Sequence, residues 1–98
     1  MICNSYDYFF ENFSNKTRMK IINSLRKGPK SVTQICKGIN EEQSKVSHNL
    51  KKLTDCHFLD VERNGKKRIY SLNKDTIIPM LNMVSNHVKK YCCEVCTK

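Results

Sequence analysis

A chain of 98 residues in which 39% of the side chains are hydrophobic makes one domain with a single modest core. Its formal net charge of +9 at pH 7 favours nucleic acid or another anionic surface as the partner. No apolar run approaches the roughly 20 residues that span a bilayer, and the first residues contain no basic segment followed by an apolar one. We therefore expect no membrane partner, no secretion signal and a cytoplasmic location.

Six cysteines would suit a disulfide framework in a secreted protein. In a chain whose pattern is helical and typical of a cytosolic protein, reduced thiols are expected instead, some of them available for metal binding or redox sensing. Cys36 is expected to be a small core residue. Cys56 is expected to pack behind the helix that precedes it, and Cys3 to lie on the N-terminal segment.

Two helices are expected at the start of the chain. The first covers residues 5–13, where aromatic side chains recur at helical spacing: Tyr6, Phe9, Phe10 and Phe13. The second begins at Ser14 or Asn15, because either side chain can cap a helix through its oxygen. Its inward face consists of Arg18, Ile21, Ile22 and Leu25. Gly28 and Pro29 end it, since glycine accepts a left-handed conformation and proline cannot continue the helix.

A helix-turn-helix pattern follows. Ser31 is expected to cap a short third helix that carries Val32, Ile35 and Cys36. Residues 38–40 are expected to form the turn. Glu41 and Glu42 are expected to begin the fourth helix, where carboxylates favour the positive end of the helix dipole.

The fourth helix has one apolar face and one polar face. Val46, Leu50 and Leu53 fall on the apolar face at helical spacing. The polar face carries short hydrogen-bonding groups and cations without a carboxylate: Gln43, Ser44, Ser47, His48, Lys51 and Lys52. Such a face suits a DNA major groove, where small polar groups reach base edges and cations neutralise phosphates. A helix face that is merely solvated is the alternative.

The pattern then changes to a two-stranded ribbon over residues 58–63 and 67–72. Asn64 and Gly65 between these segments are a strong hairpin signal. Cations surround the tip: Arg63, Lys66, Lys67 and Arg68. After a helix-turn-helix, this hairpin is expected to be a wing that contacts phosphates. Protection of a sheet edge by charge is the alternative.

A last helix is expected over residues 73–91. Its stripe consists of Ile77, Leu81, Val84, Val88 and Tyr91. Ile78 and Met80 widen the apolar surface beyond what one small core needs, and Pro79 lies near the first turn, where proline is tolerated. Together with the aromatic first helix, this surface suggests a dimer interface formed by Phe9, Phe10, Ile77, Leu81, Val84 and Val88. Completion of the monomer core by both helices is the alternative.

Three segments resemble the arsenic-repressor (ArsR) family. The segment from Ser14 to Ile22 resembles its "DPTRLRIL" helix start, the segment from Val46 to Leu53 its "VSxHLxxL" recognition helix, and the segment from Asn64 to Leu72 its "G(K/R)xxxYxL" wing. The resemblance covers residues 5–91. It implies a mainly α, winged helix-turn-helix protein of about five helices with a two-stranded wing. It also implies a homodimeric repressor whose first and last helices pair, and whose operator binding is weakened by an inducer, often a soft metal ion.

The chain departs from the metal sites that this resemblance implies. Members that sense metal on the third helix carry a Cys-x-Cys pair, where this chain has residues 31–33, Ser-Val-Thr. Members that sense metal on the last helix use acidic and histidine ligands, where this chain has Lys74, Thr76 and Lys90. Only His87 matches, so this metal site is incomplete. We therefore expect His87 to be a surface or interface residue.

A cysteine-rich tail, residues 92–98, remains as the candidate sensor. Cys92, Cys93 and Cys96 follow the last helix closely enough for their sulfurs to converge. Three thiolates suit trivalent arsenic or antimony, or Zn²⁺, Cd²⁺ or Cu⁺ with a fourth ligand. In a dimer whose terminal helices pair, Cys3 could approach the partner's tail and supply a fourth sulfur. Thiol redox sensing and a tail without a sensing role are the alternatives.

We therefore expect one domain, residues 1–98, with dimerisation helices at 5–13 and 75–91, that binds a pseudo-palindromic operator in double-stranded DNA. The expected DNA-contacting residues are Gln43, Ser44, Lys45, Ser47, His48, Lys51, Lys52, Arg63, Lys66, Lys67 and Arg68. A winged-helix module that binds an acidic protein is the alternative from another class, and a metallochaperone-like role of the tail is a third. No enzyme is expected, because the chain has no paired-carboxylate signature, no phosphate-binding glycine loop and no evident base beside a nucleophile.

Overall fold

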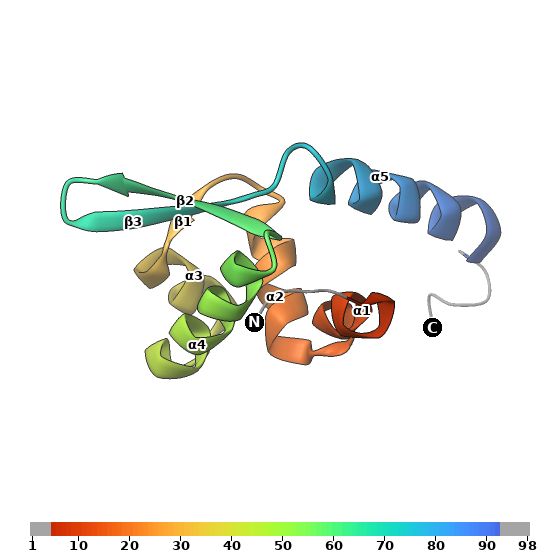
Figure 1. Ribbon diagram of the computed structural model, residues 1–98. Helices are drawn as coiled ribbons and strands as arrows, with labels where there is room; N and C mark the ends of the chain where they lie inside the picture. The colour runs from red at the N-terminus through yellow and green to blue at the C-terminus, as the bar shows by residue number, and fades with distance from the viewer. Residues whose placement is uncertain (1–4, 93–98) are drawn as a thin grey trace.

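The computed structural model of the protein describes residues 5–92 (Figure 1). Its elements in chain order are α1 (Tyr6–Ser14), α2 (Lys16–Leu25), β1 (Lys30–Ser31), α3 (Val32–Ile39), α4 (Gln43–Asp55), β2 (Leu59–Asn64), β3 (Lys67–Leu72), α5 (Ile77–His87) and a π-helical turn, η1 (Val88–Cys92). This confirms the expected winged helix-turn-helix fold. Within residues 5–92, no helix is long and apolar enough to cross a membrane.

Side-chain caps fix where α2 and α3 begin. The Oδ1 of Asn15 accepts the backbone N–H of Arg18 at 3.0 Å, so α2 begins at the expected place. At the start of α3, the hydroxyl of Ser31 accepts the Gln34 N–H at 3.3 Å, and the Gln34 side chain accepts the Ser31 N–H at 2.9 Å. This reciprocal capping box satisfies two amides that the helix cannot pair internally.

The wing belongs to an antiparallel sheet with the strand order β1-β3-β2. Leu59 pairs with Leu72 and Asn64 with Lys67, so the hairpin turns at the predicted Asn-Gly step. Gly65 has a φ of +67°, which an L side chain rarely adopts. The third strand, β1, was not predicted. It is only two residues long and pairs Lys30 with Tyr70.

The core lies where α2, α3, α4 and the sheet meet. Its buried apolar side chains are Ile21, Ile22, Leu25, Ile35, Val46, Leu50, Leu53, Phe58, Leu59, Tyr70, Leu72, Ile77 and Leu81. From α1, Phe9 and Phe13 pack on the ring of Phe58, at centroid distances of 4.9 and 5.3 Å. In Figure 1, α1 and α5 lie at the end of the molecule opposite the wing tip.

Two predicted helix starts were wrong. α4 begins at Gln43, not at Glu41, because α3 runs to Ile39 and ends on Asn40 in the left-handed conformation, with a φ of 57°. α5 begins at Ile77, four residues later than predicted. The side chain of Asn73 accepts the backbone N–H groups of Asp75 and Thr76, and this local turn competes with the helix.

The expectation of reduced thiols is wrong at one position. Cys56, at the C-cap of α4, is disulfide-bonded. Cys36 and Cys92 are free thiols of intermediate exposure. Cys36 packs against the core, as expected for a small apolar residue.

Candidate nucleic-acid interface

The α4 helix separates a core face from a solvent face. Its buried residues are Val46, Asn49, Leu50 and Leu53. The opposite face is exposed at every predicted contact position on this helix: Gln43, Ser44, Lys45, Ser47, His48, Lys51 and Lys52. These side chains are therefore free to enter a groove, and the apolar stripe fixes which face is presented.

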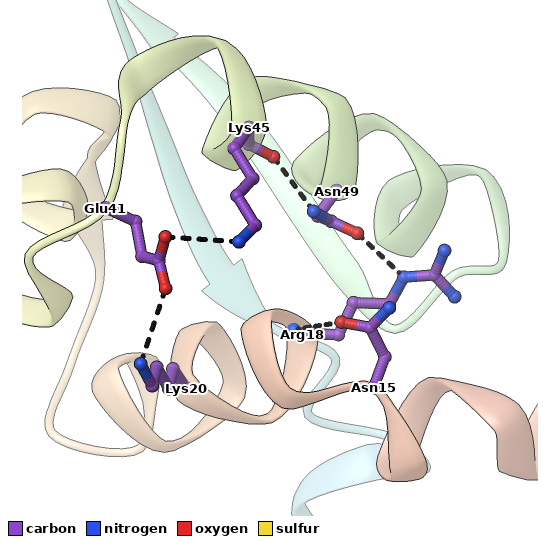
Figure 2. A network of polar contacts seen from close by, with 6 residues as sticks. All are labelled: Asn15, Arg18, Lys20, Glu41, Lys45 and Asn49. Carbon is purple, nitrogen blue, oxygen red and sulfur yellow. Dashed lines mark hydrogen bonds and ion pairs between the residues drawn. The ribbon is translucent and has the colours of Figure 1, made fainter.

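Two carboxylates beside this face form ion pairs with its lysines. Glu41 precedes α4 and forms ion pairs with Lys20 at 3.3 Å and with Lys45 at 3.4 Å (Figure 2). The hydrogen bond from Lys20, followed by the charge of Lys45, lowers the pKa of Glu41 below its usual value. At the other end of α4, Asp55 pairs with Lys51 at 3.3 Å. Lys45 and Lys51 are thus partly neutralised in the absence of a partner.

The wing presents cations without such neutralisation. Arg63, Lys66, Lys67 and Arg68 are all exposed, and none of them belongs to an ion pair among the residues that the structure describes. Between the wing and the first turn of α3 lies an open cleft of about 280 Å³, lined by Ser31, Val32, Thr33, Lys66, Lys67 and Arg68. The lining of this cleft thus combines hydroxyl groups from the start of α3 with cations from the wing.

The predicted dimer residues divide into two groups. Ile77 and Leu81 are buried inside the protomer and belong to its core. Phe9 is partly buried against that core, whereas Phe10, Val84 and Val88 are exposed. Further exposed apolar side chains lie on the same elements, namely Tyr6 on α1, Met83 on α5 and Tyr91 on η1. Exposed apolar side chains thus lie on α1, α5 and η1.

The predicted cysteine site falls mostly outside the described residues. Cys92 closes η1, whereas Cys93 and Cys96 lie beyond residue 92. Within residues 5–92, no three histidine, cysteine or acidic side chains come together as metal ligands. His87 is exposed and lies beside Tyr91, with the ring centroids 5.0 Å apart.

One polar cluster was not predicted. The guanidinium of Arg18 on α2 is buried and donates from Nε to Oδ1 of Asn49 at 2.9 Å. Its Nη1 donates to Oδ1 of Asn12 at 3.0 Å. The spacing in the sequence predicts that Arg18 lies on the inward face of α2, but it gives no signal for partners on α1 and α4.

Comparison with known proteins agrees with this architecture. The family model described as "Bacterial regulatory protein, arsR family" matches residues 15–61, from α2 into β2. The HTH-type transcriptional regulator NmtR of Mycobacterium tuberculosis is 34% identical over 71 residues, which are 72% of this chain and 59% of NmtR. The probable mercury resistance operon repressor of Streptomyces lividans is 26% identical over 73 residues, 74% of this chain and 58% of that protein. The chain therefore spans less than two thirds of the length of either relative.

The solved structures agree on the fold. The homodimeric winged helix-turn-helix DNA-binding domain of Mb0332 from Mycobacterium bovis superposes with a TM-score of 0.78, covering 90% of this chain and 82% of that one at 17% identity. This similarity extends beyond the matched family segment to most of the described chain. From the family match, the relatives and the shared fold, we conclude that this chain belongs to the ArsR family of bacterial regulatory proteins.

Proposed function

We propose that the protein is a homodimeric transcriptional repressor that binds a pseudo-palindromic site in double-stranded DNA. The observation that carries this proposal is the joint exposure of the polar face of α4 and the cationic wing. Short polar groups such as Ser44, Ser47 and His48 suit base edges. The wing cations suit phosphates on either side of the groove. A relative that is named an operon repressor supports the direction of regulation.

The dimer is proposed from the exposed apolar surface of α1, α5 and η1. Two copies that pair through this surface would bury side chains such as Met83, which is 73% exposed, and Tyr6, which is 86% exposed. Such a pair would direct both α4 helices to the same side of the duplex, at half-sites about one helical turn, roughly 34 Å, apart. The homodimeric state of the Mb0332 domain supports this arrangement.

The test is a selection of duplexes from a random pool by the wild-type protein, followed by the same selection with a Ser47→Ala, His48→Ala variant. We expect the wild type to enrich a two-fold symmetric site and the variant to lose preference at base pairs within each half-site, by about 1–3 kcal/mol per good contact. A matched control is Asn23→Ala, Ser24→Ala on α2, outside α4, the wing and the proposed dimer helices. Wild-type binding without any sequence enrichment, together with tight binding of an acidic peptide, would favour a protein-interaction module.

For the signal, we favour a thiophilic ion bound by Cys92, Cys93 and Cys96. The chemistry of three neighbouring thiolates supports As(III), Sb(III) or a Zn²⁺- or Cd²⁺-type ion. The mercury named for one relative is an ion of the same thiophilic kind. The disulfide at Cys56 gives thiol redox sensing a specific observation in its favour, because Cys56 caps the proposed reading helix. Adding arsenite or oxidant separately to the DNA complex distinguishes the two signals.

A further inference from the structure

The buried guanidinium of Arg18 joins three helices through directed hydrogen bonds. On one side it contacts Asn12 of α1, and on the other Asn49 of α4, at 3.0 and 2.9 Å. The backbone N–H of Arg18 is itself held by Asn15, the N-cap of α2. Figure 2 shows the side chain reaching from α2 to α4. The proposed dimer helix and the proposed reading helix are therefore linked through one side chain.

Both acceptors are oriented by their own helices. The amide nitrogen of Asn49 donates to the carbonyl of Lys45 at 2.9 Å, and that of Asn12 donates to the carbonyl of Phe9 at 3.1 Å. Each amide oxygen is thereby turned toward Arg18. Because the bonds are directional, a rotation of α4 about its axis would break the contact with Arg18.

The charge of Arg18 makes this contact costly to lose. A guanidinium remains protonated in proteins, and Arg18 is only 9% exposed. The described ion pairs near this site are made by Lys20 and Lys45 with Glu41, and none is made by Arg18. Amide oxygens therefore satisfy this buried cation, so that moving either asparagine away leaves donors without acceptors.

Apolar packing alone does not impose the same constraint. Val46, Leu50 and Leu53 hold α4 against the core, but apolar contact is not directional and tolerates small rotations and shifts. Asn49 is one of the buried residues of α4, whereas Ser47 and His48, which directly precede it in the chain, are exposed. Its bond to Arg18 therefore sets which way Ser47 and His48 point.

We propose that Arg18 is a positioning residue for DNA recognition, which fixes the rotation of α4 relative to α1 so that the two reading helices of a dimer match their half-sites. Arg18 itself contacts no DNA. The inference rests on the proposed function, since it concerns how well a specific site is distinguished from other DNA.

The experiment compares Arg18→Lys, Asn49→Leu and Asn49→Asp. Affinity is measured for the duplex selected by the wild type and for a scrambled duplex at the same salt concentration. Arg18→Lys keeps the charge but not the two-pronged geometry, and Asn49→Leu removes the acceptor. We expect the ratio of specific to non-specific affinity to fall at least about tenfold in both, which is about 1.4 kcal/mol. Asn49→Asp loses the bond to the Lys45 carbonyl but offers the guanidinium a charged oxygen, which forms a stronger hydrogen bond than an amide oxygen, so it should recover most of the ratio.

A core variant separates positioning from stability. Leu25→Ala on α2 removes buried apolar contacts without touching Arg18, so it should lower the melting temperature but keep the affinity ratio. All variants are compared at a temperature at which each is fully folded. Should Arg18→Lys fail to fold, the Asn49→Leu and Asn49→Asp pair decides the question.

The outcomes are distinct. A wild type that does not distinguish the two duplexes overturns the proposed function, and this inference with it. If the wild type distinguishes the two duplexes and Asn49→Leu keeps the same ratio of specific to non-specific affinity as Leu25→Ala, the positioning role of Arg18 is overturned but the proposed function is not. A loss of ratio that Asn49→Asp recovers supports it.

Discussion

Replacing Val84 with Glu is expected to convert the proposed dimer into monomers. Full burial of a Val, Met or Phe side chain is worth about 1.5–3 kcal/mol. Six apolar side chains on α1, α5 and η1 are between 38% and 86% exposed, so that pairing two copies would gain roughly 1 kcal/mol for each, or about 12 kcal/mol in total. Lost translational and rotational freedom costs about 4–15 kcal/mol. The net gain on pairing is therefore a difference between two terms of similar size.

A carboxylate at position 84 would add a large unfavourable term to this balance. An unpaired charge buried in an interface costs about 3–5 kcal/mol, and two-fold symmetry places it there twice. The dissociation constant should therefore rise by at least about 1,000-fold, which corresponds to about 4 kcal/mol. Val84 is 52% exposed in the protomer, so the same substitution should leave the fold of each protomer intact.

Sedimentation velocity over a concentration series measures this change. The matched control is Val61→Glu, since Val61 is 43% exposed but lies on the wing strand β2. The control should sediment like the wild type. A Val84→Glu variant that sediments as the wild-type dimer, or a wild type that is monomeric at micromolar concentration, would show that this surface does not mediate dimerisation.

Three further predictions concern charge and thiols. Lys67→Ala should weaken binding to all duplexes alike and reduce the magnitude of the slope of log affinity against log salt concentration by about 0.9. A salt titration followed by fluorescence anisotropy measures this slope. An unchanged slope would show that Lys67 contacts no phosphate. Lys20 holds the pKa of Glu41 below its ordinary value of 4.5, so the ion pairs stabilise the protein above that value, and their contribution is lost as the pH falls through the lowered pKa. The difference in melting temperature between the wild type and Glu41→Gln should therefore disappear in acid, and a difference that grows in acid would contradict the pairing. A variant with serine in place of Cys92, Cys93 and Cys96 should bind the selected duplex but should not release it on addition of arsenite. Release equal to that of the wild type would exclude the tail as the sensor.

Local features of the fold were predictable because short-range chemistry decides them. The Asn64-Gly65 turn needs a positive φ at glycine, and the structure has it at Gly65. Ser31 caps α3 as expected, because its hydroxyl reaches an amide three residues away. The exposed face of α4 followed from the apolar stripe opposite. Each of these features depends on residues that are close together in the sequence.

Features that depend on distant contacts were not predictable in this way. The contact between Arg18 and Asn49 spans 31 residues, and no local pattern marks it. Strand β1 has two residues and exists because β3 pairs with it. On α5, the same stripe contains buried Leu81 and exposed Val84, and periodicity alone does not separate a core residue from one that is free to join a partner.

Footprinting of the wild-type protein on its selected duplex tests the central claim most directly. The proposed dimer should protect two major-groove half-sites whose centres lie about one helical turn, roughly 34 Å, apart. The flanking phosphates should be protected as well, where the wing residues Lys66 and Lys67 would contact the backbone. A single protected half-site, or uniform protection that moves with the duplex ends, would contradict a dimer that reads a pseudo-palindromic operator.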